Sequence, residues 1–290
     1  MHHSGAVTTS PTRIPEDPMI RTLTSAALAV FVTASAAAAQ QRPNTVFLDE
    51  LTWTEVRGAI DEGVTTIIVP TAGTEQNGPH MVLGKHKFII NHASDLIARE
   101  LGNALVAPVI AYVPEGAIDG PDGPTGHMRY AGAITLPNEH FMKLLEYAAR
   151  SLEVHGFTDI VFIGDSGGNQ NGMRTVSEML NEEWAAAGKQ GRVHFVGDYY
   201  AGNGFRDWLM EEHGYDAGTI GGHAGISDTS QLLYIAPEHI RQGELAPGGG
   251  FEGSGVSGDP TKASVEYGRM GVQLKVEAAV RQIRALTQGR

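Results

Sequence analysis

The sequence of 290 residues contains no cysteine. Disulfide bonds, zinc sites built from thiolates and a lipid anchor on an N-terminal cysteine are therefore all excluded. The mature domain has to be held together by its hydrophobic core alone.

A basic surface is missing as well. Lys and Arg number 21 against 33 Asp and Glu, which leaves a formal charge of −12. Polyanions are bound by clustered Lys and Arg, and no stripe of such residues is present. We therefore expect neither nucleic acid nor an anionic membrane surface as a partner, and we expect a small-molecule substrate instead.

No apolar run is long enough to cross a bilayer. Near the N-terminus, Arg21 precedes a short apolar stretch at 26–33, and an Ala-x-Ala pattern ends at Ala39. This layout is typical of a secretory signal peptide, here residues 19–39. Residues 1–18 are then an extension or a mis-assigned start. We predict a periplasmic or secreted protein whose mature form, one domain over 45–290, is not inserted in the membrane.

The mature part alternates strand-like and helix-like patterns. Apolar runs predict buried strands, and helical spacing with glycine stops predicts helices. The predicted strands are 65–73, 104–113, 159–164 and 192–200, and the predicted helices are 86–102, 138–156, 171–188 and 262–288. This alternation predicts an α/β fold with a mainly parallel sheet. The strand exits after Val69, Val113 and Ile163 should face one pocket.

Five stretches, in order along the chain, resemble motifs of the creatininase family. They are TEQNGPHMVLGKH (74–86), HMRYAGAITLP (127–137), GDSGGNQNG (164–172), GGHAGISDTSQLLYIAP (221–237) and GVSGDPTKASVEYG (255–268). The resemblance implies a three-layer α/β/α sandwich that commonly assembles into hexamers, so we expect a homo-oligomer. It also implies hydrolysis of C–N bonds in small, often cyclic, amides at a two-metal centre.

The ligand positions of that centre depart from the family pattern. Glu75 is kept, but His86 stands at the bridging aspartate and Ser166 at a histidine of the first metal. At the second metal, Asn77 replaces a histidine and Ile226 replaces a glutamate. An amide and an isoleucine cannot replace such ligands. The resemblance with these changes predicts that two-metal chemistry is lost and that no metal is bound.

The substituted positions suggest a different chemistry. Ligands of one ion lie close together, so Glu75, His86 and Ser166 should converge. A carboxylate, an imidazole and a hydroxyl are the groups of a nucleophilic triad. Residues 164–168 also fit G-x-S-x-G between a strand and a helix. We predict Ser166 as nucleophile, His86 as base and Glu75 as its orienting partner.

Other polar residues are candidates for binding the oxyanion or the substrate. They are Asn77, Gly167, Gly168, His80, His127, His223 and Asp228. Asn77 could instead cap the turn, and His80 could only brace its loop. Packing or substrate contact is expected of His223 and Asp228 rather than direct catalysis.

Three functions remain open from the sequence. The first is a secreted serine-type hydrolase of a small ester, lactone or cyclic amide, with esters and lactones favoured because alkoxides leave more easily than amines. The second is an amidohydrolase that keeps a single divalent metal ion, held by Glu75 and His86 with Asp165 or His223. The third is a non-catalytic binding protein of the cell envelope.

Overall fold

The computed structural model describes residues 42–245, 251 and 253–288. The extension and the signal peptide predicted for residues 1–39 lie outside the described residues. Residues Arg42–Arg290 group together as one compact unit. In the described part of the chain, no helix combines the length and the apolar character needed to span a membrane.

A sheet of four parallel strands forms the middle layer. Its strands are β1 (Thr66–Thr71), β2 (Ala104–Val106), β3 (Asp159–Gly164) and β4 (Arg192–Phe195), in the order β2-β1-β3-β4. Each strand enters the sheet after a helix, which is why the pairing is parallel. The predicted α/β class is therefore confirmed.

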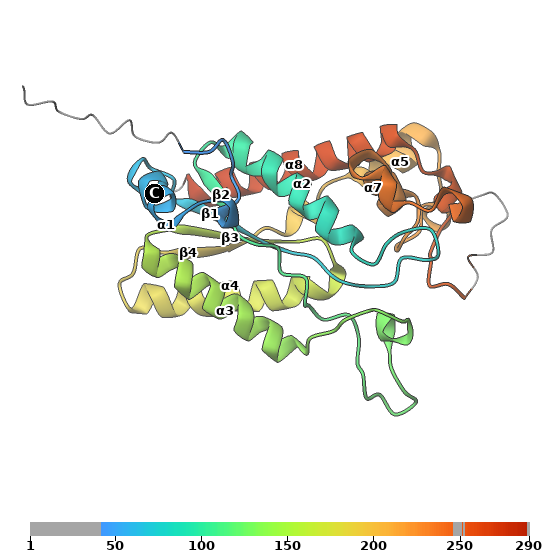
Figure 1. The fold of residues 1–290 in the computed structure, drawn as a ribbon, viewed down its shortest axis with the longest axis horizontal. Coiled ribbons are helices and arrows are strands. Elements are labelled where there is room, and N and C mark those ends of the chain that lie inside the picture. Colours follow the sequence, from blue (N-terminus) through green and yellow to red (C-terminus); the bar gives the residue numbers. More distant parts are fainter. Residues whose placement is uncertain (1–41, 246–250, 252, 289–290) are drawn as a thin grey trace, which may run out of the picture. The chain divides into compact units, whose positions relative to one another are not determined.

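Helices cover both faces of the sheet (Figure 1). One layer contains α2 (Lys85–Leu101) and α8 (Val265–Thr287), and the other contains α3 (Asn138–His155) and α4 (Gln170–Ala186). The remaining α-helices are α1 (Trp53–Asp61), α5 (Phe205–His213), α6 (Ala217–Ile220) and α7 (Ile226–Ile235). Short 3₁₀ turns occupy Leu48–Glu50, Gly126–Arg129, Gly167–Asn169, Gly197–Tyr199, Pro237–His239, Gln242–Leu245 and Pro260–Lys262. The layers form the predicted α/β/α sandwich.

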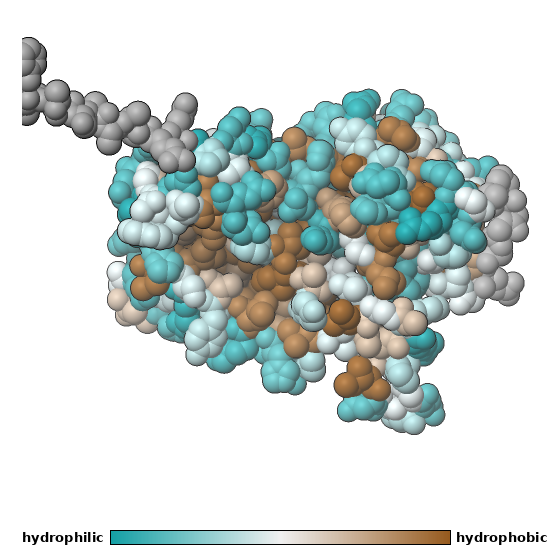
Figure 2. Space-filling view, viewed as in Figure 1, coloured by the Kyte–Doolittle hydropathy of each residue, from teal (hydrophilic) through white to brown (hydrophobic). Residues whose placement is uncertain are grey.

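Two hydrophobic clusters, one on each face of the sheet, hold the layers together. Ile67 and Phe162 belong to the cluster that includes α3 and α4, while Ile68 and Ile163 belong to the cluster that includes α2 and α8. Successive strand residues point to opposite faces, so a strand covered on both sides must be apolar throughout. Figure 2 shows apolar side chains gathered between the two helix layers.

The second strand is much shorter than predicted. Regular pairing ends at Val106, although Ala107 still donates to the Ile68 carbonyl and Ile110 to the Pro70 carbonyl. Pro108 has no N–H to donate, so the ladder is interrupted there. Beyond it the chain continues toward Val113 as an irregular segment along the same sheet.

Candidate active site

A pocket of about 690 Å³ lies where the strands end, as the three strand exits predict. Its walls include Glu75 after β1, Glu115 after the irregular segment, and Ser166 after β3. The far side comes from α7 and α8, which contribute Asp228 and Lys275. Carboxyl ends of parallel strands are the usual place for ligands in such folds.

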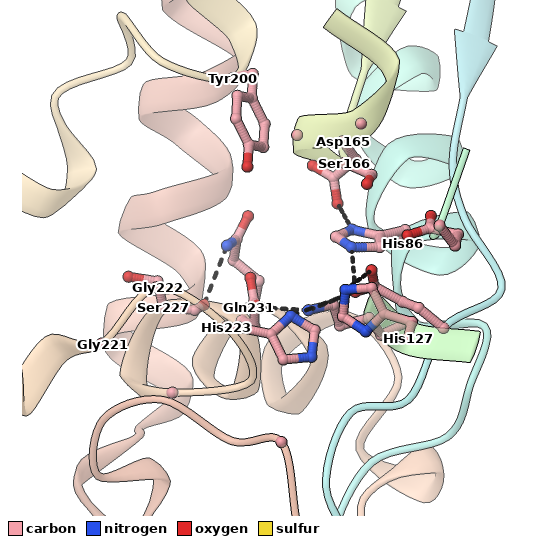
Figure 3. A pocket seen from close by; sticks show the side chains of 18 of the residues that line it. His86, His127, Asp165, Ser166, Tyr200, Gly221, Gly222, His223, Ser227 and Gln231 are labelled. Atoms are coloured by element: carbon pink, nitrogen blue, oxygen red, sulfur yellow. Dashed lines mark hydrogen bonds and ion pairs between the residues drawn. The ribbon is translucent and has the colours of Figure 1, made fainter. Parts of the chain in front are cut away.

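His86, near the start of α2, is held between two carboxylates (Figure 3). Its Nδ1 lies 2.7 Å from Asp165 Oδ2 and its Nε2 lies 2.8 Å from Glu75 Oε1. Burial and the Lys85 charge oppose protonation of the ring, but Glu75 and Asp165 outweigh them and raise the pKa of His86 to about 9. His86 is therefore an imidazolium at neutral pH.

This arrangement does not show the predicted triad. Glu75 does contact His86, but Asp165 occupies the nitrogen that a serine nucleophile would need, and Ser166 Oγ has no hydrogen-bond partner among the described residues. A base must also be neutral to accept the serine proton, whereas His86 is already protonated. Hydrogen bonding by two buried acids, rather than one, is the physical reason for the difference.

Two buried lysines balance the remaining carboxylates. Lys85 is completely buried, with Nζ 3.3 Å from Glu75 Oε1 and in contact with Asp228. Lys275 contacts Asp165 from α8. Burial alone would raise the pKa of Asp228, but the Lys85 charge holds it well below its usual range. Each acid of this network is thus ionised and paired, as buried charges must be.

On the other side of Glu75, two histidines meet. His127 Nε2 lies 3.2 Å from Glu75 Oε2, and His223 Nδ1 lies 3.5 Å from Glu75 Oε1. Nε2 of His223 lies 2.8 Å from the Gln76 carbonyl, to which it donates, so Nδ1 is the unprotonated nitrogen that faces Glu75. Within the described chain, Glu75, His127 and His223 are grouped closely enough to hold a metal ion, with one ligand atom of each within 4.8 Å of the others.

The protonation states of this group suit a metal. Burial, reinforced by the Lys85 charge, lowers the pKa of His223 to about 4, and burial also lowers the pKa of His127. Burial would raise the pKa of Glu75, but His86 and Lys85 hold it well below its usual range. Metal ligands must be neutral imidazoles and ionised carboxylates, and all three residues meet that condition at neutral pH.

Glu115 is a second carboxyl group in the pocket. It is buried, and its Oε1 has no hydrogen-bond partner within the described part of the chain. Burial, followed by the charge of Glu75, raises the pKa of Glu115 to about 8. It therefore holds a proton at neutral pH, in contrast to Glu75.

The structure separates the other predicted binding residues into two sets. Gly167, Gly168, His127, His223 and Asp228 line the pocket. Asn77 does not, because its amide donates at 3.0 Å to the carbonyls of Glu75 and Val82 and so fixes the turn. His80 is also buried away from the pocket, with Nε2 3.0 Å from Thr229 Oγ1. The side chains of both residues are therefore engaged in contacts within the fold, outside the pocket.

Sequence reasoning missed Lys85, Glu115, Tyr200 and Lys275. Lys85 directly precedes His86, and Glu115 directly follows a strand exit, so position alone offered a signal for these two. Tyr200 and Lys275 reach the pocket from a turn and from α8, far along the chain. No local pattern marked them.

Known proteins resemble this chain over most of its length. A mycofactocin precursor peptide peptidase of Mycobacterium tuberculosis (strain CDC 1551 / Oshkosh) is 30% identical over 229 residues, covering 75% of this chain and 84% of that protein. A creatinine amidohydrolase of Pseudomonas putida is 25% identical over 200 residues, covering 67% and 74%. Both relatives are hydrolases.

Solved structures share the fold. A creatinine amidohydrolase (creatininase) matches with a TM-score of 0.69 at 20% identity, covering 85% of this chain and all of that one. A manganese creatininase and a mutant creatininase of Zn-Zn type each match with a TM-score of 0.67 at 20% identity, covering 83% of this chain and 98% of theirs.

The expectation that no metal is bound is wrong. Structures of this fold carry manganese or zinc in their names, and Glu75, His127 and His223 offer a ligand set here. The lost family ligands pointed away from a metal, but His127 and His223 meet beside Glu75, the ligand that is kept. The family model for creatinine amidohydrolase matches residues 49–283, and the chain therefore belongs to the creatininase family.

Proposed function

We propose that this protein is a metal-dependent hydrolase that cleaves the C–N bond of a small amide or peptide. The observation that carries the proposal is the meeting of Glu75, His127 and His223 in one pocket, with both imidazoles neutral. This corresponds to the single-metal alternative rather than to a serine-type enzyme.

The donor set fits a catalytic metal. Two histidines and one glutamate form a ligand set found in catalytic zinc sites, where a fourth position stays open for water or substrate. His223 also has the supporting contact expected of a ligand, since its Nε2 donates to the Gln76 carbonyl and so fixes the ring. Ala224, the next residue, has a φ of 53°, which stores backbone strain beside this ligand.

A metal ion bound there supplies a polarised carbonyl and a water of lowered pKa. Residues of the protein orient Glu75 and hold a proton in the pocket. His86 and Lys85 fix Glu75 Oε1 and leave Oε2 directed toward His127. Glu115 holds a proton in the same pocket. A volume of about 690 Å³ accommodates a small amide or the end of a peptide.

The relatives favour C–N bonds over esters. The names of the mycobacterial and pseudomonad relatives specify a precursor peptide and creatinine as their substrates. An amide is a harder substrate than an ester because the amine leaves poorly, and metal assistance addresses that difficulty. Export and self-assembly remain part of the proposal as the sequence predicts them.

The test combines metal analysis with turnover. We expect the purified protein to bind about one Zn²⁺ or Mn²⁺ per chain in elemental analysis. It should cleave members of a peptide and cyclic-amide library, and EDTA should abolish that turnover reversibly. His127→Ala and His223→Ala should each weaken metal binding at least tenfold, on the order of what loss of one ligand costs. His140→Ala, an exposed histidine outside the pocket, is the matched control.

Two results would overturn the proposal. One is turnover that EDTA leaves unchanged in a protein that binds no metal. The other is a fluorophosphonate adduct on Ser166 that forms equally well with EDTA, which would restore the serine-type mechanism.

A further inference from the structure

Hydrogen-bond donors without acceptors among the described residues gather on the pocket wall where β3 ends. We propose that Ser166, Gly167 and Gly168 form an oxyanion cradle, which binds the carbonyl oxygen of the substrate as negative charge develops on it. The inference rests on the proposed function and gives Ser166 the role of donor in place of nucleophile.

Ser166 is the first part of the argument. Ser166 is only 5% exposed, it lines the pocket, and its Oγ has no partner among the described residues. The Oγ is not one of the fully buried unpaired atoms, so this hydroxyl faces the pocket, where it can donate to a ligand. His86 cannot remove its proton, because both nitrogens of that ring bind carboxylates.

The backbone supplies two more donors. Gly167 and Gly168 begin the 3₁₀ turn that runs directly into the 17-residue helix α4, and neither N–H has an acceptor in the described chain. The first N–H groups of a helix point outward and favour negative charge. Here they line the same pocket as the Ser166 hydroxyl.

Close packing explains why residue 168 is glycine, because a Cβ there would lie 2.3 Å from the Pro114 carbonyl oxygen. A Cβ on Gly167 would lie 3.0 Å from the Tyr200 hydroxyl, a tight contact with the end of a side chain. Figure 3 shows the Tyr200 hydroxyl pointing into the pocket, across from Asp165 and Ser166. Burial and nearby carboxylates raise the pKa of Tyr200, so it keeps its proton and is a fourth donor.

The neighbouring charges permit an anion here. Asp165 adjoins Ser166 and would repel negative charge if it stood alone. Its carboxylate is hydrogen-bonded to His86 and ion-paired with Lys275, so its negative charge is compensated. His86 bridges Glu75 and Asp165, the residue before Ser166, and the cradle lines the same pocket as Glu75.

The chemistry follows from hydrolysis of an amide. Addition of water to the carbonyl carbon forms a C–O bond and moves the C=O π pair onto the oxygen, where the cradle's donors stabilise it. When the pair returns, the C–N bond breaks, and the amine leaves with a proton that the water supplied. The donors act only while the oxygen carries this extra charge, so they should affect kcat more than KM.

Ser166→Ala tests the role in turnover. We expect kcat to fall on the order of 10²-fold with KM nearly unchanged, as for loss of one oxyanion donor. The thermal midpoint should not change, because Oγ makes no bond within the described fold. Ser227→Ala is the matched control, since Ser227 lines the same pocket from α7 and its hydroxyl has no assigned role. A normal kcat in Ser166→Ala would overturn the cradle.

A binding measurement separates this inference from the metal. Inorganic phosphate, a tetrahedral anion, is titrated by calorimetry into protein freed of metal with EDTA. We expect binding by the unchanged protein and about tenfold weaker binding by Ser166→Ala, as for loss of a hydrogen bond to a charged group. No phosphate binding, or equal binding by both proteins, would overturn the cradle while leaving the metal proposal intact. If the protein proves to bind no metal, phosphate binding that depends on Ser166 would still support the cradle.

Discussion

Glu75 divides the site into two regions that use the same kind of side chain in opposite ways. One side is formed by Lys85, His86, Asp165, Asp228 and Lys275, which also line the pocket. We call it the sealed side because its histidine is charged and both ring nitrogens are bound. On the open side, formed by His127 and His223, the histidines are neutral and face the pocket. All three rings have a nitrogen within 3.5 Å of a Glu75 oxygen.

Among these three rings, the number of adjacent acids decides the charge more than burial does. His86 is the more deeply buried ring, yet its pKa is raised, because it alone of the three binds two carboxylates. Among the residues that the structure describes, His127 and His223 contact only one carboxylate, that of Glu75. This carboxylate also contacts two cations, Lys85 and His86. Burial therefore lowers the pKa of both His127 and His223. The sealed side therefore holds structure together, and the open side is left to bind a ligand.

The largest expected change in the free energy of unfolding comes from removing His86 from the sealed side. His86→Leu leaves Glu75 and Asp165 without their shared imidazolium, and removal of one partner from a buried charge network costs about 3–5 kcal/mol. His223→Leu should cost less than about 1 kcal/mol, because its ring is partly exposed and its charge is not used. Urea unfolding with EDTA present measures both. Equal losses in the two variants would contradict the division of the site.

The pH dependence of the free energy of unfolding distinguishes the charged histidine from the neutral ones, with an intermediate expected effect. The pKa of His86 is raised in the fold to about 9 from 6.5, so its contribution is complete below pH 6.5 and is lost as pH rises through about 9. The pKa values of His80 and His223 are lowered to about 4 from 6.5, so their contribution is lost as pH falls from 6.5 toward 4. At about 1.4 kcal/mol per pKa unit, His86 should contribute on the order of 3 kcal/mol to the alkaline limb, and each of the two histidines should contribute a similar amount to the acid limb.

Variants show which residue causes each limb of the curve of unfolding free energy against pH. Glu115, whose pKa is raised to about 8, adds to the fall up to that pH, so the interval from 8 to 9 belongs to His86. His86→Leu should flatten the alkaline limb in that interval, and His80→Leu should reduce the acid limb. The measurement is the free energy of unfolding in urea from pH 4 to pH 10 with EDTA. A curve that rises toward pH 9 would show that His86 is neutral in the fold.

The fold could be predicted from the sequence because its signals are local. The runs that became β1 and β3 are apolar almost throughout, and Gly102 and Gly156 end α2 and α3 with a positive φ. Such patterns depend on neighbours in the chain. The second strand failed where Pro108 interrupts the ladder. The fourth strand, predicted to residue 200, ends at Phe195, because a 3₁₀ turn follows at Gly197–Tyr199.

The site could be predicted only in part, because its chemistry depends on contacts between distant residues. The motifs correctly pointed to Glu75, His86 and Ser166 in one pocket, and they included His127 and His223 as well. They could not show that Asp165 would bind Nδ1 of His86, or that Lys275 from α8 would neutralise Asp165. Protonation follows from these contacts, so the sequence misjudged the metal, and the triad that it predicted is not shown.

The smallest expected effect tests the open side. With EDTA present, His127→Phe should change the free energy of unfolding by less than about 1 kcal/mol, because its ring is partly exposed and its contact with Glu75 involves no charge on the histidine. With zinc at about 100 times its Kd, the unchanged protein should gain about 2.7 kcal/mol from binding. His127→Phe should lose most of that gain, whereas His140→Ala should keep it. A loss above about 2 kcal/mol without metal would instead place His127 in the sealed network, where removal of one partner of a buried charge costs about 3–5 kcal/mol.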